Sequence, residues 1–200
     1  MRPQGVRRRG LLFLLVVAFA LAIPLFLGRL DLGGGRWPVK TFRDRDRALV
    51  RMVPVDATVA GLSRVPRPAA ASFLGLRRIA PVELTVYLVR ARLRAVIDGV
   101  DGDIHLLLAD PDDPARTMIA EIPVPMFSIG SGLGDVFNEE RSEVQRHRRE
   151  RNASVEVTGI GFFDPYTHDR PGGTPTNGLE LHPVIGLKFL PNITREEGDR

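Results

Sequence analysis

Residues 82–97 alternate between apolar and polar side chains. One face of an extended chain there carries apolar side chains at Tyr87, Val89, Ala91, Leu93, Ala95 and Ile97, and the other carries Arg90, Arg92 and Arg94. A period of two predicts a β-strand with one buried face. Turn-forming residues at 98–103 lead into a second alternation at 104–109. We predict an antiparallel hairpin that pairs Leu93 with Leu108, Ala95 with Leu106 and Ile97 with Ile104, because the apolar faces then coincide.

Further strands are predicted at residues 117–122, 154–163 and 179–189, and residues 53–62 favour one extended piece. A charged helix from 139 to about 151, capped by Asn138, separates the first two of these strands. The order strand, strand, strand, helix, strand, strand is that of the OB-fold, a small Greek-key barrel. We therefore predict a mainly β protein with an OB-like five-stranded barrel and one helix between strands 3 and 4. Another all-β or α+β arrangement is the alternative.

The N-terminus has the pattern of an export signal or a membrane anchor. Three arginines at 7–9 precede an uncharged apolar run at 11–27, which places the N-terminus in the cytoplasm and the rest across the membrane. As a helix the run is about 25 Å long, slightly short of the ~30 Å hydrocarbon core. Ala20-Leu21-Ala22 fits a cleavage site, whereas the apolar residues at 23–27 favour retention. We expect residues 1–28 to be a signal peptide or an anchor, with the membrane as a partner if they are uncleaved.

Charge and composition narrow the function classes. Four of the 28 Lys and Arg residues lie before residue 29 and none of the 24 acids does, so the remainder carries 24 charges of each sign. A neutral body disfavours nucleic acid as a partner. The absence of cysteine excludes disulfides, thiolate zinc sites and cysteine catalysis. We divide the chain into residues 1–28, a Gly- and charge-rich solvated spacer at 29–52, the barrel at 53–190 and a flexible tail at 191–200.

Three strings stand out in the barrel region: DGDIHLLLAD at 101–110, VTGIGFFD at 157–164 and NGLELHP at 177–183. Together they resemble an uncharacterised family of exported bacterial proteins. The resemblance covers residues 81–190 and implies an OB-like barrel and export, with no chemistry attached. A smaller resemblance, Asp101-Gly102-Asp103, is to thermonuclease-like OB-fold nucleases, in which acids hold calcium and arginines stabilise phosphate. Asp103 and Asp110 would be the acids and Arg92 or Arg94 the clamp, but that family's other catalytic acid and arginine have no matching positions here, so we do not carry over the activity.

Several acids and histidines could gather at one end of the barrel. This candidate ligand or metal cluster consists of Asp101, Asp103, His105, Asp164, His168, Glu180 and His182. Glu180 and His182 share a strand face, opposite Leu179 and Leu181. Histidine with carboxylates could bind a divalent metal or act in acid–base catalysis. The competing interpretation is that the acids shape turns and the histidines are satisfied structurally, since no metal-ligand spacing is present. We expect no cofactor other than such a metal.

Arg90, Arg92 and Arg94 form a candidate anion-binding strip. No aromatic residue alternates with them, as stacking on a nucleic-acid strand would require, so an ion-paired or solvated face is the competing interpretation. Two functions follow: an exported OB-like module that binds an envelope protein or glycan, or a metal-dependent hydrolase, such as a phosphodiesterase, that uses the acids and histidines. A purely structural envelope protein is the third hypothesis.

Overall fold

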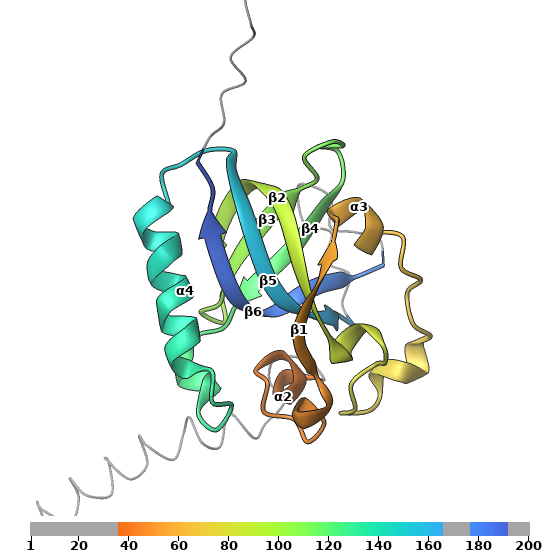
Figure 1. Ribbon diagram of the computed structural model, residues 1–200. Coiled ribbons are helices and arrows are strands. Elements are labelled where there is room, and N and C mark those ends of the chain that lie inside the picture. Colours follow the sequence, from red (N-terminus) through yellow and green to blue (C-terminus); the bar gives the residue numbers. More distant parts are fainter. Residues whose placement is uncertain (1–35, 166–176, 192–200) are drawn as a thin grey trace, which may run out of the picture. The chain divides into compact units, whose positions relative to one another are not determined.

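A computed structural model describes residues 36–165 and 177–191 (Figure 1). The predicted signal or anchor, His168 and residues 192–200 of the predicted tail lie outside the described residues. None of the helices in the described ranges has the length and apolar character needed to cross a bilayer.

The described chain folds around a closed five-stranded barrel, as predicted. Its strands are β2 (Thr85–Asp98), β3 (Ile104–Ala109), β4 (Thr117–Ile122), β5 (Ala153–Phe163) and β6 (Leu179–Phe189). They lie in the order β2-β3-β4-β6-β5, and pairing of β5 with β2 closes the barrel. Neighbours are antiparallel except β4 and β6, whose parallel contact is a single pair, Ala120 with Leu181. The interior is filled by alternate apolar side chains such as Leu106, Leu108 and Val157.

The predicted hairpin is correct at one end and wrong at the other. Leu93 pairs with Leu108, but an irregularity between Leu93 and Ala95 shifts the register, so that Val96 rather than Ala95 pairs with Leu106. The shift moves Val96 onto the core side and leaves Ile97 exposed. A bulge of this kind re-aims every later side chain on its strand, which is why the alternation in residues 82–97 predicted the wrong face beyond the bulge. The strand also begins three residues late, because Val82–Leu84 form a 3-10 turn.

The single helix lies between β4 and β5 but is displaced along the sequence. α4 spans Gly134–His147, not 139–151, and Leu133 rather than Asn138 occupies its N-cap position. Phe137 and Val144 are fully buried in the barrel core, and Figure 1 shows α4 alongside β6. Because Phe137 packs into the core, the helix already begins at Gly134, before the charged stretch that starts at residue 139.

β5 approaches its neighbours closely at two glycines. A Cβ on Gly161 would lie 2.6 Å from the carbonyl oxygen of Val82, and one on Gly159 would lie 2.9 Å from Leu181 Cβ. Real side chains do not reach such distances, so only glycine allows this small barrel to curve here.

The region before the barrel packs against it, contrary to the predicted solvated spacer. α2 (Trp37–Lys40) is followed by β1 (Arg51–Ala57), which runs parallel to β2 at the edge of the sheet. Trp37, Val39 and even Arg36 and Lys40 are buried. The predicted extended piece at 53–62 is also wrong in its second half, since α3 (Val59–Leu62) begins after an N-cap at Thr58. The remaining short 3-10 helices are Arg47–Leu49, Ala70–Phe73 and Pro125–Ser128.

A buried ion pair fixes this N-terminal region to the barrel. Glu83 accepts hydrogen bonds from both terminal nitrogens of Arg36, from Ile79 N at 2.7 Å and from Phe163 N at 2.9 Å. Arg36 also donates to the carbonyl oxygen of Arg77 at 2.8 Å. Both charged side chains are wholly buried, so each depends on the other for its stability in the protein interior.

Candidate functional site

The residues of the candidate site lie on the outward face of the barrel strands. On β3, β4 and β6 the residues that alternate with core positions are His105, Glu121, Glu180 and His182. His105 pairs directly with Glu121 across the β3–β4 ladder. The parallel β4–β6 contact then places Glu180 and His182 on the same side, because side chains two apart share a face. The predicted separation of Glu180 and His182 from the apolar face of Leu179 and Leu181 is therefore confirmed.

Two further groups complete this buried polar cluster, one from each side. Asp103 precedes β3, and its Oδ1 accepts a hydrogen bond from Val124 N at 2.8 Å. Lys40 enters from α2, with its Nζ 3.7 Å from Glu121 Oε2 and 3.8 Å from Asp164 Oδ2. The Lys40 ammonium also lies 5.4 Å from the centre of the Phe162 ring. The Lys40 ammonium thus faces the carboxylate of Glu121 in β4 and that of Asp164 directly after β5.

Glu121 lies between two histidines. Its Oε2 is 2.9 Å from His182 Nδ1, and its Oε1 is 3.4 Å from His105 Nδ1. The other nitrogen of His182, Nε2, lies 3.8 Å from Asp103 Oδ2. Asp101 Oδ1 approaches His105 Nε2 at 4.0 Å from the partly exposed turn before β3. These contacts form one continuous row. It runs from Asp101 at the surface through His105, Glu121 and His182 to Asp103 in the interior.

Burial and mutual attraction shift the protonation of the buried polar cluster. Burial by itself would lower the pKa of Lys40, but the surrounding carboxylates, Glu121 first, raise it above its ordinary value. Burial works to raise the pKa of Glu121, yet the Lys40 ammonium and His182 outweigh it and lower that pKa. Burial lowers the pKa of His182. Burial, with repulsion from Asp101, raises the pKa of Asp103 to about 7. At neutral pH the cluster holds a charged Lys40, an ionised Glu121 and a neutral His182.

The structure brings most of the predicted cluster residues together. Asp103, His105, Asp164, Glu180 and His182 are all buried on this face, and Asp101 stands at its edge. These residues do not form an open rim of the barrel, because they are buried and Lys40 from α2 packs against them. Among the described residues, Asp103, Glu121 and His182 are the set whose ligand atoms approach closely enough to hold one metal ion.

Sequence reasoning missed Glu121 and Lys40, the residues at the centre of this site. Glu121 stands between core residues Ala120 and Ile122 in a strand, so its polar character at an alternating position was an available signal. Lys40 stands in the short apolar stretch Trp37 to Phe42, which was an available signal of burial, but the Gly-rich residues before this stretch and the charged residues after it favoured a solvated spacer.

The predicted arginine strip has partners on its own surface. Arg90 Nε donates to Glu156 at 2.9 Å, and its guanidinium lies 4.0 Å from Asp56. Arg94 donates to the side chain of Asn152 at 3.2 Å.

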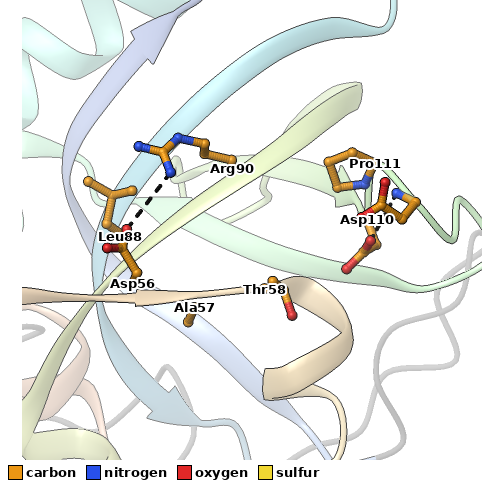
Figure 2. A pocket seen from close by; sticks show the side chains of 8 residues that line it. Asp56, Ala57, Thr58, Leu88, Arg90, Asp110 and Pro111 are labelled. Atoms are coloured by element: carbon orange, nitrogen blue, oxygen red, sulfur yellow. Dashed lines mark hydrogen bonds and ion pairs between the residues drawn. The ribbon is translucent and has the colours of Figure 1, made fainter.

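Beside Arg90 a groove of about 310 Å³ runs between β1 and the loop after β3 (Figure 2). The groove is lined by Asp56, Ala57, Thr58, Leu88, Arg90, Asp110, Pro111 and Asp112. Three carboxylates against one guanidinium make this groove unsuited to a bound anion.

The pair of acids suggested by the nuclease resemblance has two separate roles. Asp110 accepts backbone hydrogen bonds from Ala60 N at 2.8 Å and from Asp112 N at 3.0 Å. It therefore orders the turn after β3 and the start of α3, whereas Asp103 belongs to the buried polar cluster.

Strand order and the position of α4 place the protein in the class of OB-like barrels. Neither protein-family models nor curated proteins give a match to the chain. Among solved structures it is similar to the asparaginyl-tRNA synthetase of Entamoeba histolytica, with a TM-score of 0.41 and 13% identity over 69% of this chain and 23% of the synthetase. A putative aspartyl-tRNA synthetase from Leishmania major Friedlin has a TM-score of 0.38 and 14% sequence identity, and the match covers 70% of this chain and 21% of the synthetase. OBody AM3L09, in complex with hen egg-white lysozyme, has a TM-score of 0.34 and 14% sequence identity, and the match covers 55% of this chain and 84% of the OBody. The chain thus spans less than a quarter of either synthetase, and at these scores the similarities carry no functional argument.

Proposed function

We propose that this protein is an exported, non-catalytic OB-like binding module of the bacterial envelope, tethered to the membrane if residues 11–27 are retained. The OB-like barrel supports a binding role, because such barrels present strand faces and loops to their ligands. The arginines before an apolar run, and the resemblance to an exported family, support export.

The exposed strand β1 carries this proposal. Every residue from Arg51 to Asp56 is exposed, and within the described ranges β1 pairs with β2 only. Val53 is 80% exposed, and Met52 and Val55 are about half exposed. Large apolar side chains gathered on one surface strand are typical of a contact with another macromolecule.

The surroundings of β1 favour a protein partner with acidic side chains. Arg45, Arg47 and Arg51 are exposed at or before the start of the strand. The one acid of β1, Asp56, already faces Arg90. Pro54 lacks an N–H group, so it interrupts the edge for a continuous backbone ladder. The partner is therefore an envelope protein whose apolar surface, bordered by carboxylates, packs on the side chains of β1.

Aromatic side chains argue against a glycan or a nucleic acid as the partner. No aromatic residue in the ranges 36–165 and 177–191 is exposed. Sugar rings pack on exposed aromatic faces, and single-stranded nucleic acids stack on them. A protein surface requires neither.

Site-specific photocrosslinking in the native host tests this function. A photoreactive amino acid replaces Val53 in the full chain, and a matched control replaces Gln145, an exposed residue of α4. We expect one discrete protein adduct from position 53 and none from position 145. Arg51→Glu should reduce that adduct at least about fivefold, since one reversed charge at a rim is worth about 1 kcal/mol or more.

Four results would overturn the proposal. They are no adduct, equal adducts at positions 53 and 145, an adduct with lipid or with a second copy of the chain, and an adduct that Arg51→Glu leaves unchanged.

The competing function, a metal-dependent hydrolase, rests on the approach of Asp103, Glu121 and His182. Their side chains are at most 1% exposed, so a substrate would reach them only if the residues around them moved. Hydrolysis of bis(p-nitrophenyl) phosphate by the full chain with Zn²⁺ or Mn²⁺, lost in His182→Asn, would replace our proposal with this one.

A further inference from the structure

Three adjacent strands bring an imidazole and two carboxylates to one point. Asp103 precedes β3, Glu121 lies in β4 and His182 lies in β6, and one ligand atom from each lies within 4.8 Å of the other two. Two ligands of the same zinc ion, each bonded at about 2.0–2.2 Å, lie roughly 3–4 Å apart. Asp103 Oδ2 and His182 Nε2 already meet this requirement at 3.8 Å.

These two atoms are incompletely satisfied by the protein. Both side chains are fully buried, and within the described residues neither Asp103 Oδ2 nor His182 Nε2 makes a hydrogen bond. An unsatisfied polar atom in the interior costs about 1–3 kcal/mol. A cation between them would satisfy both at once.

The donor set selects the class of ion. Imidazole nitrogen with carboxylate oxygen suits zinc and its first-row neighbours, whereas calcium and magnesium prefer oxygen ligands alone. His182 Nδ1 lies 2.9 Å from Glu121 Oε2, so Glu121 stands beside the ring whose Nε2 faces Asp103.

From this geometry we propose that Asp103, Glu121 and His182 form a structural site for a zinc-type divalent ion. The site is independent of the β1 surface and needs no substrate access. Lys40 is its built-in competitor, because the ammonium lies 3.7 Å from Glu121 Oε2 and repels a second cation.

Titration of the full chain with ZnCl₂ tests the site, with calorimetry for affinity and elemental analysis after dialysis for stoichiometry. We expect one ion per chain. His182→Asn should weaken binding at least about 100-fold, beyond what loss of an outer contact would cause. The matched control is His147→Asn: His147 lies within 3.2 Å of Glu143 and Glu150 on the surface of α4, so it could bind zinc adventitiously. This control should leave the titration unchanged.

The variant Lys40→Met distinguishes a real metal site from a loss of binding that is caused by misfolding. Removing the competing charge should tighten zinc binding at least about tenfold, a gain that a damaged fold cannot produce. Bound Co²⁺ should also lose its visible spectrum in His182→Asn and keep it in His147→Asn. Absence of saturable binding in both wild type and Lys40→Met would overturn the proposal. So would loss of all binding in His147→Asn, and either result leaves the crosslinking test of β1 unaffected.

Discussion

Removing the Glu83 carboxylate should be among the most damaging single changes in this protein. In Glu83→Ala the Arg36 guanidinium stays wholly buried, with two carbonyl oxygens and the Phe162 ring beside it but no carboxylate within bonding distance. An uncompensated buried charge costs about 3–5 kcal/mol. The N–H groups of Ile79 and Phe163 also lose their acceptor, at about 1 kcal/mol or more each. Because these costs overlap, we expect the free energy of unfolding to fall by about 4–6 kcal/mol.

Urea denaturation of the full chain measures this loss with two probes. The only tryptophan, Trp37, follows Arg36 directly and packs on Phe127 with 5.2 Å between ring centres, so its fluorescence reports on α2. Far-ultraviolet circular dichroism reports on the barrel. In Glu83→Ala we expect fluorescence to change at lower urea than dichroism, because the ion pair is what fixes this region to the barrel.

The matched control is Glu156→Ala, which removes the partner of the largely exposed Arg90. Exposed pairs contribute about 0–1 kcal/mol. The double variant Arg36→Met/Glu83→Leu should recover most of the loss, because apolar residues of similar volume replace buried ion pairs at little cost. If Glu83→Ala lost no more stability than Glu156→Ala, the reasoning about buried charge would be refuted.

Three further predictions concern the core, the pH dependence and the N-terminal boundary. Leu106→Ala should lower the free energy of unfolding by about 2–5 kcal/mol, because Leu106 is fully buried in the barrel; a loss below about 1 kcal/mol in urea would contradict its place there. Burial and two neighbouring glutamates raise the pKa of Glu140 from 4.5 to about 7. The folded state therefore binds this proton more tightly, and stability is full below about pH 4.5 and declines as pH rises through about 7. Glu140→Gln should remove that decline and be about 1–2 kcal/mol more stable than wild type in mildly alkaline thermal melts; parallel pH profiles would count against it. Deleting residues 1–35 should leave cooperative unfolding, whereas deleting 1–44 should abolish it, because only the first deletion keeps Arg36; equal melting curves would be inconsistent with the buried pair.

Alternation of side chains was enough to predict much of the barrel. The strands at 104–109, 117–122 and 179–189 coincide with β3, β4 and β6, because a strand with one buried face must repeat every two residues. The helix between strands 3 and 4 then identified the OB-like order. Most of the candidate cluster followed as well, since His105, Glu180 and His182 occupy the opposite face of these strands and Asp103 directly precedes β3.

Tertiary contacts decided the features without a local signal. The irregularity after Leu93 re-aims the end of β2, and burial of Phe137 begins α4 earlier than its charged residues suggest. The largest change concerns Arg36 and Lys40, whose place in a Gly- and charge-rich segment predicted a solvated spacer. A charged side chain is stable in the interior only beside an opposite charge. For these two residues the opposite charges come from Glu83 and Glu121, which are distant in sequence, so only the folded chain could reveal that both cations are buried.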